Sequence, residues 1–149
     1  LLQNSQKRRM IMLNKTEMYE AVIGVIPGYK PGEDLRNKII FDIEEISIIC
    51  QKILSANSIK VISGIVEECK AVYPIEWGAP VGGEYCFKIV FTRNPEFDKD
   101  KSEFYHAVLE NVKRLKAYFH QSTVTLTLND WGRISMRRFV DDKDFEEEM

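Results

Sequence analysis

The stretch EYCFKIVFTRNPEFDKDKSEFYHAVLENVKRLKAYFHQ, residues 84–121, changes its hydrophobic period from two to about 3.6 part-way along. In residues 84–93 every second side chain is large and apolar or aromatic, which predicts a β-strand with one buried face. These side chains are Tyr85, Phe87, Ile89 and Phe91. From residue 102 to about residue 121, apolar residues recur at steps of three and four, which predicts a helix with one apolar stripe. A strand joined to a core-facing helix in this way is typical of an α+β domain.

The same two periods recur on both sides of this stretch. Three more strands and one more helix follow from them: strands over residues 18–26, 59–73 and 122–129, and a helix over residues 35–56. Gly64 lies inside the second of these strands and predicts a bulge there. Near the C-terminal end, Ile134 and Met136 favour a short extra strand.

The predicted elements follow the order strand, helix, strand, strand, helix, strand. With right-handed crossovers this order fits a ferredoxin-like β-α-β-β-α-β sandwich, an α+β fold in which an antiparallel sheet carries two helices on one face. The extra C-terminal strand would be an addition to it. This fold predicts that the two helix stripes, which contain Ile43 and Leu109, pack on the same side of the sheet in one core.

Length and composition suit a single domain, which we place at residues 16–140 of the 149. Residues 1–15 are expected to form a flexible leader, and residues 141–149 an acidic disordered tail. No stretch approaches the ~20 apolar residues of a membrane span. The three cysteines contain no Cys-x-x-Cys pair, which argues against a disulfide framework or a zinc site and predicts a cytoplasmic location. Since no other cofactor or metal motif is found, we expect no cofactor and no metal.

The predicted sheet leaves one face uncovered, and its side chains are a mixture of apolar residues, threonines and one lysine. The candidate interface residues on this face are Val22, Lys88, Val90, Thr123, Thr125 and Thr127. Apolar surface of this kind often meets a partner, so we predict a homodimer or another protein partner. The alternative is a solvated surface, because threonine is common in exposed strands.

Two tryptophans in turns are the candidate ligand or partner contacts. Glu76 and Trp77 lie in a loop rich in glycine and proline, and Trp131 lies in a second turn. Each tryptophan could instead cover the edge of the core.

A basic cluster offers possible anion contacts at Arg133, Arg137 and Arg138. Its alternative is a solvated surface or pairing with nearby acids. Because the net charge is −2, binding of nucleic acid is disfavoured.

No residue pattern specifies a reaction, and no catalytic residue is assigned. The preferred function is a non-catalytic binding or assembly module that dimerises or meets a protein partner through its open sheet face. The first alternative is a small-molecule-binding protein or small enzyme of the dimeric α/β-barrel type, with Tyr85, His106 or Glu67 in a pocket between sheet and helices. The second is a phosphate or nucleic-acid binder. The sequence leaves catalysis undecided, with the non-catalytic function preferred.

Overall fold

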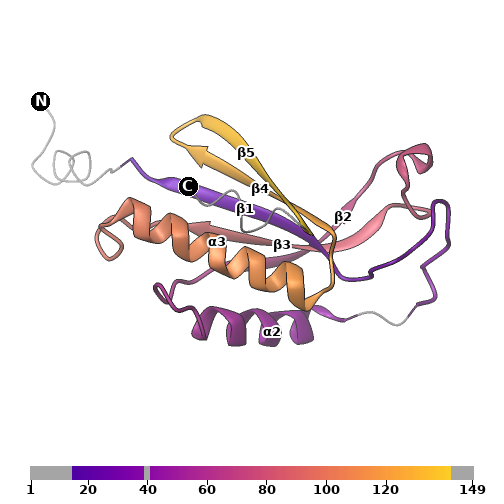
Figure 1. The fold of residues 1–149 in the computed structure, drawn as a ribbon, viewed down its shortest axis with the longest axis horizontal. Coiled ribbons are helices and arrows are strands. Elements are labelled where there is room, and N and C mark those ends of the chain that lie inside the picture. Colours follow the sequence, from indigo (N-terminus) through magenta and orange to yellow (C-terminus); the bar gives the residue numbers. More distant parts are fainter. Residues whose placement is uncertain (1–14, 39–40, 142–149) are drawn as a thin grey trace, which may run out of the picture.

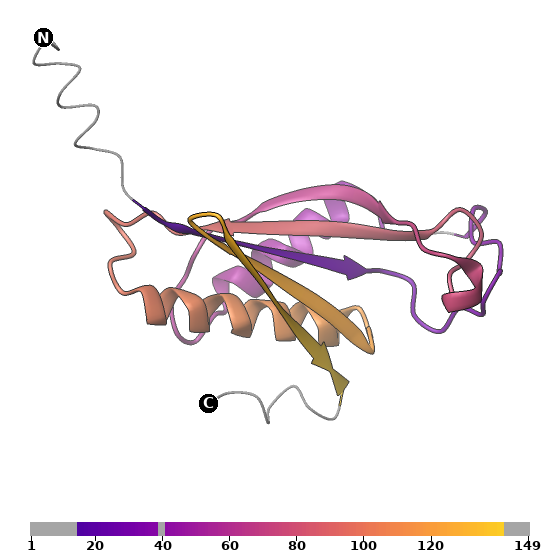
Figure 2. The same cartoon turned by 90° about the horizontal axis from the view of Figure 1, so that it is seen from above.

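A computed structural model of the chain describes residues 15–38 and 41–141, and its architecture is a sheet covered by two helices on one side (Figures 1 and 2). The strands are β1 (Glu17–Gly24), β2 (Ile65–Ala71), β3 (Glu84–Thr92), β4 (Thr123–Asp130) and β5 (Arg133–Val140). The helices are α2 (Ile43–Ser55) and α3 (Lys101–Tyr118), and a short 3₁₀ helix, Ile75–Trp77, lies between β2 and β3. The predicted leader and tail fall almost entirely outside the described residues.

The five strands form one sheet in the order β2-β3-β1-β4-β5, and every neighbouring pair is antiparallel. Strand β3 lies between β1 and β2, which are joined by the crossover through α2. This is the ferredoxin-like arrangement with β5 added at one edge, so the predicted fold class is confirmed.

A single hydrophobic core lies between the sheet and the helices. Ile46 of α2 and Leu109 of α3 are both buried in it, together with Phe87 at the centre of β3. Alternation places every second residue of β3 in this core. The residues between them lie on the opposite side of the sheet, which we call the open face.

Helix α2 begins later than the hydrophobic pattern predicts, at Ile43 rather than Leu35. Asp42 caps it, since its side chain accepts a hydrogen bond of 2.8 Å from the Glu45 amide. The segment before it is held by another loop instead. The Gly32 amide donates to the Ala79 carbonyl at 2.8 Å, and residue 33 accepts from residue 81 at 2.9 Å. Tertiary pairing of two loops therefore overrides the local helical pattern.

Strand β2 is also shorter than predicted, because the chain from residue 59 is first turned by Asn57. The Asn57 side-chain oxygen accepts hydrogen bonds from the amides of residues 59 and 60 at 2.9 and 3.0 Å. Gly64 lies just before β2, and the β2–β3 register has no break, so the predicted bulge is wrong. Its role is close packing: a Cβ there would lie 3.1 Å from Ile89.

No helix in the described part of the chain is long and apolar enough to span a membrane.

Candidate functional site

One carboxyl group marks the end of the sheet where β1 stops and β3 starts. Glu84 is the first residue of β3 and is paired with Ala71 of β2. Two residues further on, Cys86 is paired with Gly24, the last residue of β1. Because side chains alternate along a strand, Glu84 lies on the open face, away from both helices. Its side chain is half-buried.

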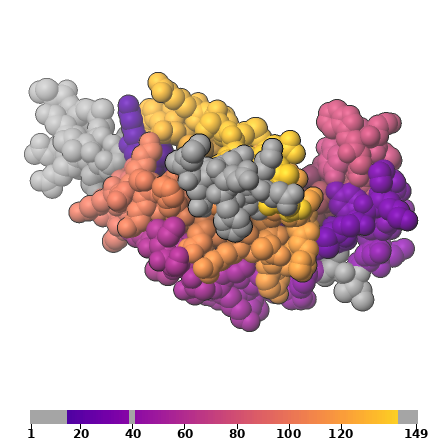
Figure 3. Space-filling model, in the orientation of Figure 1, coloured from indigo at the N-terminus to yellow at the C-terminus, as the bar shows by residue number. Residues whose placement is uncertain are grey.

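Two loops come together beside Glu84. Segments 27–38 and 72–83 lie side by side at one end of the molecule in Figure 3, joined by the backbone hydrogen bonds given above. Each loop supplies one tyrosine. The hydroxyls of Tyr29 and Tyr73 each donate to Glu84 Oε2, at 3.0 and 3.3 Å, and their oxygens lie next to each other. We call these three residues the Glu84 cluster.

The surroundings of the Glu84 cluster shift its acid–base properties. Burial raises the pKa of the Glu84 carboxyl, while the hydrogen bonds from the two tyrosines act in the opposite direction. Burial also raises the pKa of the Tyr29 and Tyr73 hydroxyls, so both stay neutral donors at neutral pH. Within the described part of the chain, Glu84 forms no ion pair. Its negative charge is therefore available to a cationic ligand.

A glycine makes room for this carboxylate. A Cβ on Gly24 would lie 2.1 Å from Glu84 Oε1 and 2.6 Å from Gln121 Oε1, closer than real Cβ atoms approach. The absence of a side chain at Gly24 thus lets two side-chain oxygens, from β3 and from the turn before β4, converge over the end of β1.

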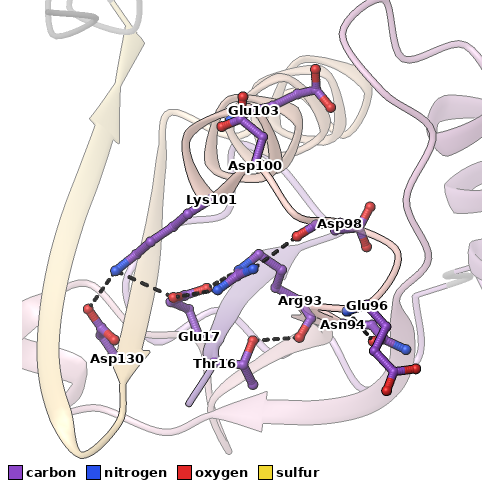
Figure 4. A network of polar contacts seen from close by, with 10 residues as sticks. All are labelled: Thr16, Glu17, Arg93, Asn94, Glu96, Asp98, Asp100, Lys101, Glu103 and Asp130. Carbon is purple, nitrogen blue, oxygen red and sulfur yellow. Dashed lines mark hydrogen bonds and ion pairs between the residues drawn. The ribbon is translucent and has the colours of Figure 1, made fainter. Parts of the chain in front are cut away.

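A second polar cluster, at the opposite end of β1, is different in kind (Figure 4). Glu17 is 3% exposed and accepts hydrogen bonds from the Arg93 guanidinium, which lowers the pKa of Glu17. Lys101 Nζ lies 3.4 Å from Glu17 and 3.1 Å from Asp130. Arg93 also donates to the Asp98 carbonyl at 2.9 Å. Each charge here is matched by an opposite one, as expected of a group that holds strands and α3 together.

The tryptophans proposed as contacts from the sequence lie at opposite ends of the sheet. Trp77 is 78% exposed in the 72–83 loop, the loop that carries Tyr73, and Glu76 beside it is also exposed. Trp131 is 61% exposed in the β4–β5 turn, where Lys15 Nζ lies 5.4 Å from the ring centroid. The structure therefore does not bring the two rings together.

The residues predicted to form a sheet-face interface do share the open face. Register pairs place Val22 beside Lys88 and Thr125, and Glu20 beside Val90 and Thr127. Thr123 begins β4 on the same side. Whether a partner covers this face stays a prediction.

The predicted arginine cluster is split by the strand that carries it. Arg137 donates to the Tyr105 hydroxyl at 3.0 Å on the helix side. Arg138 is exposed opposite Thr125, and Arg133 is opposite Asp130 at the turn. Neighbours on a strand point to opposite faces, so the three do not form one anion site.

Sequence reasoning missed the Glu84 cluster altogether. It treated Glu84 as the first residue of a strand and Tyr29 and Tyr73 as loop or strand-end residues. The available signal was a glycine at each side of this position: Gly24 at the end of the first strand, and Gly83, with a positive φ of 91°, just before Glu84. Glycines at matching strand ends often mark a close backbone approach.

Comparison with known proteins decides the class of the molecule. Residues 14–134 match the sequence model of the SAM lyase family. The chain belongs to this family. Two solved structures share its fold at 14% identity: a phage SAM lyase in complex with S-methyl-5'-thioadenosine (TM-score 0.58, covering 86% of this chain and 92% of that one) and a phage SAM lyase in the apo state (TM-score 0.60, 94% and 95%). No curated protein sequence matches the chain significantly.

The family membership overturns the preferred function from the sequence. A non-catalytic assembly module that acts by protein binding is wrong; the findings indicate an enzyme that processes a small molecule. The three residues named for a pocket between sheet and helices are not brought together either. His106 is exposed and bonded to the Ser102 carbonyl at 2.8 Å, Glu67 is exposed on β2, and Tyr85 packs against the core. Among the described residues, no group of three or more potential ligands is placed to hold a metal ion.

Proposed function

We propose that this chain is a SAM lyase that cleaves a carbon–sulfur bond of S-adenosylmethionine and releases S-methyl-5'-thioadenosine, with the Glu84 cluster at its active site. The family match over residues 14–134 supports the reaction class. The phage SAM lyase that shares the fold was solved with S-methyl-5'-thioadenosine, which is the thioether half of such a cleavage.

The observation that carries the proposal is the carboxylate of Glu84, which forms no ion pair with any of the residues that the structure describes. S-adenosylmethionine has a sulfonium, an ammonium and a carboxylate, so it is a net cation. A half-buried carboxylate attracts a cation more strongly than an exposed one, because the surrounding dielectric is lower. The hydroxyls of Tyr29 and Tyr73 hold Glu84 Oε2, which leaves Oε1 over Gly24 to face the substrate.

The bond changes can be balanced without water. When the bond between Cγ and sulfur breaks, its electron pair goes to sulfur and neutralises the sulfonium. The remaining four-carbon part can close on itself if its own carboxylate attacks Cγ, which gives a lactone and needs no proton transfer to the protein.

Elimination would instead require Glu84 to remove a proton from Cβ, a position that no carbonyl acidifies directly. Ring closure needs no such proton transfer, because the attacking group is the substrate's own carboxylate. The site therefore favours the lactone, with Glu84 acting by charge and position.

The setting of the enzyme is part of the same proposal. The described cysteines are free thiols, as expected of a reducing compartment, and we retain the predicted cytoplasmic location. We also retain a second copy of the chain as the proposed partner of the open face, placed at the Met18 end of β1 so that the Glu84 end of β3 stays free for the substrate. The open face exposes several large apolar side chains. These are Met18, Val22, Ile65, Ile134 and Met136.

Product analysis tests the proposal. Purified protein is incubated with S-adenosylmethionine, and S-methyl-5'-thioadenosine and the four-carbon product are followed by liquid chromatography and mass spectrometry, with a protein-free incubation for spontaneous breakdown. We expect lactone and thioether in equal amounts, and a loss of about 100-fold or more in Glu84→Gln. The matched control is Glu96→Gln, an exposed glutamate in the β3–α3 turn. Release no faster than in buffer, or full activity in Glu84→Gln, would refute it.

A further inference from the structure

Two cysteines lie opposite each other at the end of the sheet that carries the Glu84 cluster. Cys69 of β2 is the register partner of Cys86 of β3, so both side chains leave the sheet on the same face. Side chains alternate along β3, which places Cys86 on the open face with Glu84 rather than in the core with Phe87. The third cysteine, Cys50, is buried in the core on the side of the helices. The fold therefore brings two thiols together and keeps the third apart.

The spacing of this pair suits a disulfide bond. Directly opposed residues of antiparallel strands have Cα atoms about 4.5 or 5.5 Å apart, and disulfides join Cα atoms about 4.4–6.8 Å apart. The Cβ atoms of such residues lie about 4.5–5.5 Å apart, and a disulfide brings them to about 3.5–4.5 Å, so closure needs an approach of up to about 1 Å. Strand β2 is at the edge of the described sheet and pairs with β3 alone, so it can move inward without breaking another strand pair.

The two thiols have different surroundings. Cys69 is half-buried, whereas Cys86 is 2% exposed. Burial raises the pKa of both thiols, that of Cys86 to about 12, and the nearby Glu84 carboxylate adds to the shift at Cys86. At Cys69 the Lys88 ammonium acts in the opposite direction. A small disulfide in solution can therefore reach Cys69, which forms a thiolate more readily, and Cys86 is placed to react second.

We propose that Cys69 and Cys86 are a redox-sensitive modification site, which reacts with low-molecular-weight disulfides such as glutathione disulfide and closes to a cross-strand disulfide beside the Glu84 cluster. The Cys69 thiolate attacks one sulfur of the oxidant, whose S–S bond breaks and releases a first thiolate. The Cys86 thiolate then attacks the Cys69 sulfur of the mixed disulfide and displaces the second. Two protein thiols are oxidised, one disulfide is reduced, and the protons lost by the cysteines end on the two released thiols.

Closure changes the geometry of the Glu84 cluster. The Cys86 thiol donates to the Glu84 carbonyl at 3.5 Å, and oxidation removes this hydrogen bond. Ala71, the register partner of Glu84, lies two residues after Cys69, and Tyr73 lies two residues further on. An inward movement of β2 therefore shifts the Tyr73 hydroxyl, which donates to Glu84 Oε2 at 3.3 Å.

The size of this movement sets the expected effect on the rate. A misplacement of about 1 Å lowers rates by about 100-fold, and closure requires at most that, so the disulfide form should lose about 10- to 100-fold in kcat/KM. This effect rests on the proposed function, whereas closure of the disulfide does not.

The experiment follows thiols and activity together. Wild-type protein is equilibrated in glutathione buffers of graded redox potential, and the free thiols are then counted by alkylation of the unfolded chain. We expect the count to fall from three to one, with a Cys69–Cys86 bond in the peptide map. The protein should migrate as a single chain on a non-reducing denaturing gel. Release of S-methyl-5'-thioadenosine should fall in parallel and return with dithiothreitol.

Two variants serve as controls. Cys50→Ala keeps the pair, so it should lose two thiols and respond as the wild type does. Cys69→Ser removes the accessible member; its reduced form should keep wild-type kcat/KM, and glutathione disulfide should change neither its activity nor its count of two thiols. Thermal melting followed by circular dichroism confirms that each variant is folded.

The outcomes separate this inference from the proposed function. A wild-type count that stays at three, disulfides between copies of the chain, or unchanged kcat/KM in the disulfide form would overturn the inference and leave the proposed function intact. A reduced wild type that releases no S-methyl-5'-thioadenosine would overturn the proposed function and the effect on the rate, while the thiol count would still decide whether the disulfide closes.

Discussion

Replacing Gly24 by alanine tests the placement of Glu84 most directly. The new Cβ would lie 2.1 Å from Glu84 Oε1, and real Cβ atoms essentially never approach closer than 3.0 Å. The carboxylate must therefore retreat by about 1 Å. A misplacement of this size lowers rates by about 100-fold, which corresponds to about 2.7 kcal/mol in the activation free energy.

Stability should respond differently from activity. The atoms in the way are the ends of two flexible side chains, and Gly24 does not have a positive φ that would strain an alanine. Loss of backbone freedom in the unfolded chain favours the alanine variant by about 0.4–1 kcal/mol, which offsets part of the crowding. We expect the melting temperature of Gly24→Ala to stay within a few degrees of the wild type, about the shift that 1 kcal/mol produces.

The assay is kcat/KM for release of S-methyl-5'-thioadenosine, paired with thermal melting. The matched control is Gly132→Ala in the β4–β5 turn, where φ is +89° and nothing lies within 4 Å of a Cβ. It should lose stability and keep its activity, the reverse of Gly24→Ala. In the double variant Gly24→Ala, Glu84→Asp, the shorter side chain avoids the new Cβ. The loss in activation free energy, taken from kcat/KM, should therefore be smaller than the sum of the losses in the two single variants. Wild-type kcat/KM in folded Gly24→Ala would refute the placement of the carboxylate.

Three further changes are predicted. Tyr73→Phe removes a hydrogen bond that lowers the pKa of Glu84. In the wild type, kcat/KM should fall as the pH drops through the raised pKa of Glu84, above pH 4.5, and in Tyr73→Phe this fall should begin at a higher pH. An unchanged pH profile would count against the Glu84 cluster. Glu17→Gln leaves Arg93 buried without its partner and should lower the free energy of unfolding by about 3–5 kcal/mol at pH 7. The stabilisation by the Glu17 carboxylate is lost as the pH falls through its lowered pKa. Urea denaturation should therefore show the difference in unfolding free energy between wild type and Glu17→Gln becoming smaller below pH 4.5. A difference that stays constant with pH would contradict the pairing of Glu17 with Arg93. Val90→Asp on the open face should shift the chain toward monomer in light scattering, whereas a wild type that is already monomeric disproves the predicted interface.

The hydrophobic periods along the chain were sufficient to predict the fold, because they identify which side chains face the core. The alternation around Phe87 and the stripe through Leu109 each identify one buried face, and only one compact arrangement covers both. The boundaries near residues 35 and 59 failed because distant or side-chain partners set them: the pairing of segments 27–38 and 72–83, and the cap formed by Asn57.

The site was beyond the reach of such patterns. Tyr29 and Glu84 are 55 positions apart and meet through two irregular loops, neither of which has a periodic signal. A single glutamate at a strand end also resembles any solvated residue in the sequence. Its distinguishing property is that no residue in the described part of the chain forms an ion pair with it, and this becomes visible only when the neighbours of Glu84 are known. The sequence pattern identifies the open face but not the carboxylate on it. An assembly module was therefore the preferred function.

The sidedness of the sheet has a practical consequence for anyone handling this protein. Because Glu84 lies on the face of the sheet that α2 and α3 leave uncovered (Figure 2), ligands should approach it from that side. Immobilisation or dye labelling through the outer side of α2, for example at Lys52, should therefore leave the entry route clear. A tether anchored at Lys88 would instead obstruct traffic to and from the carboxylate.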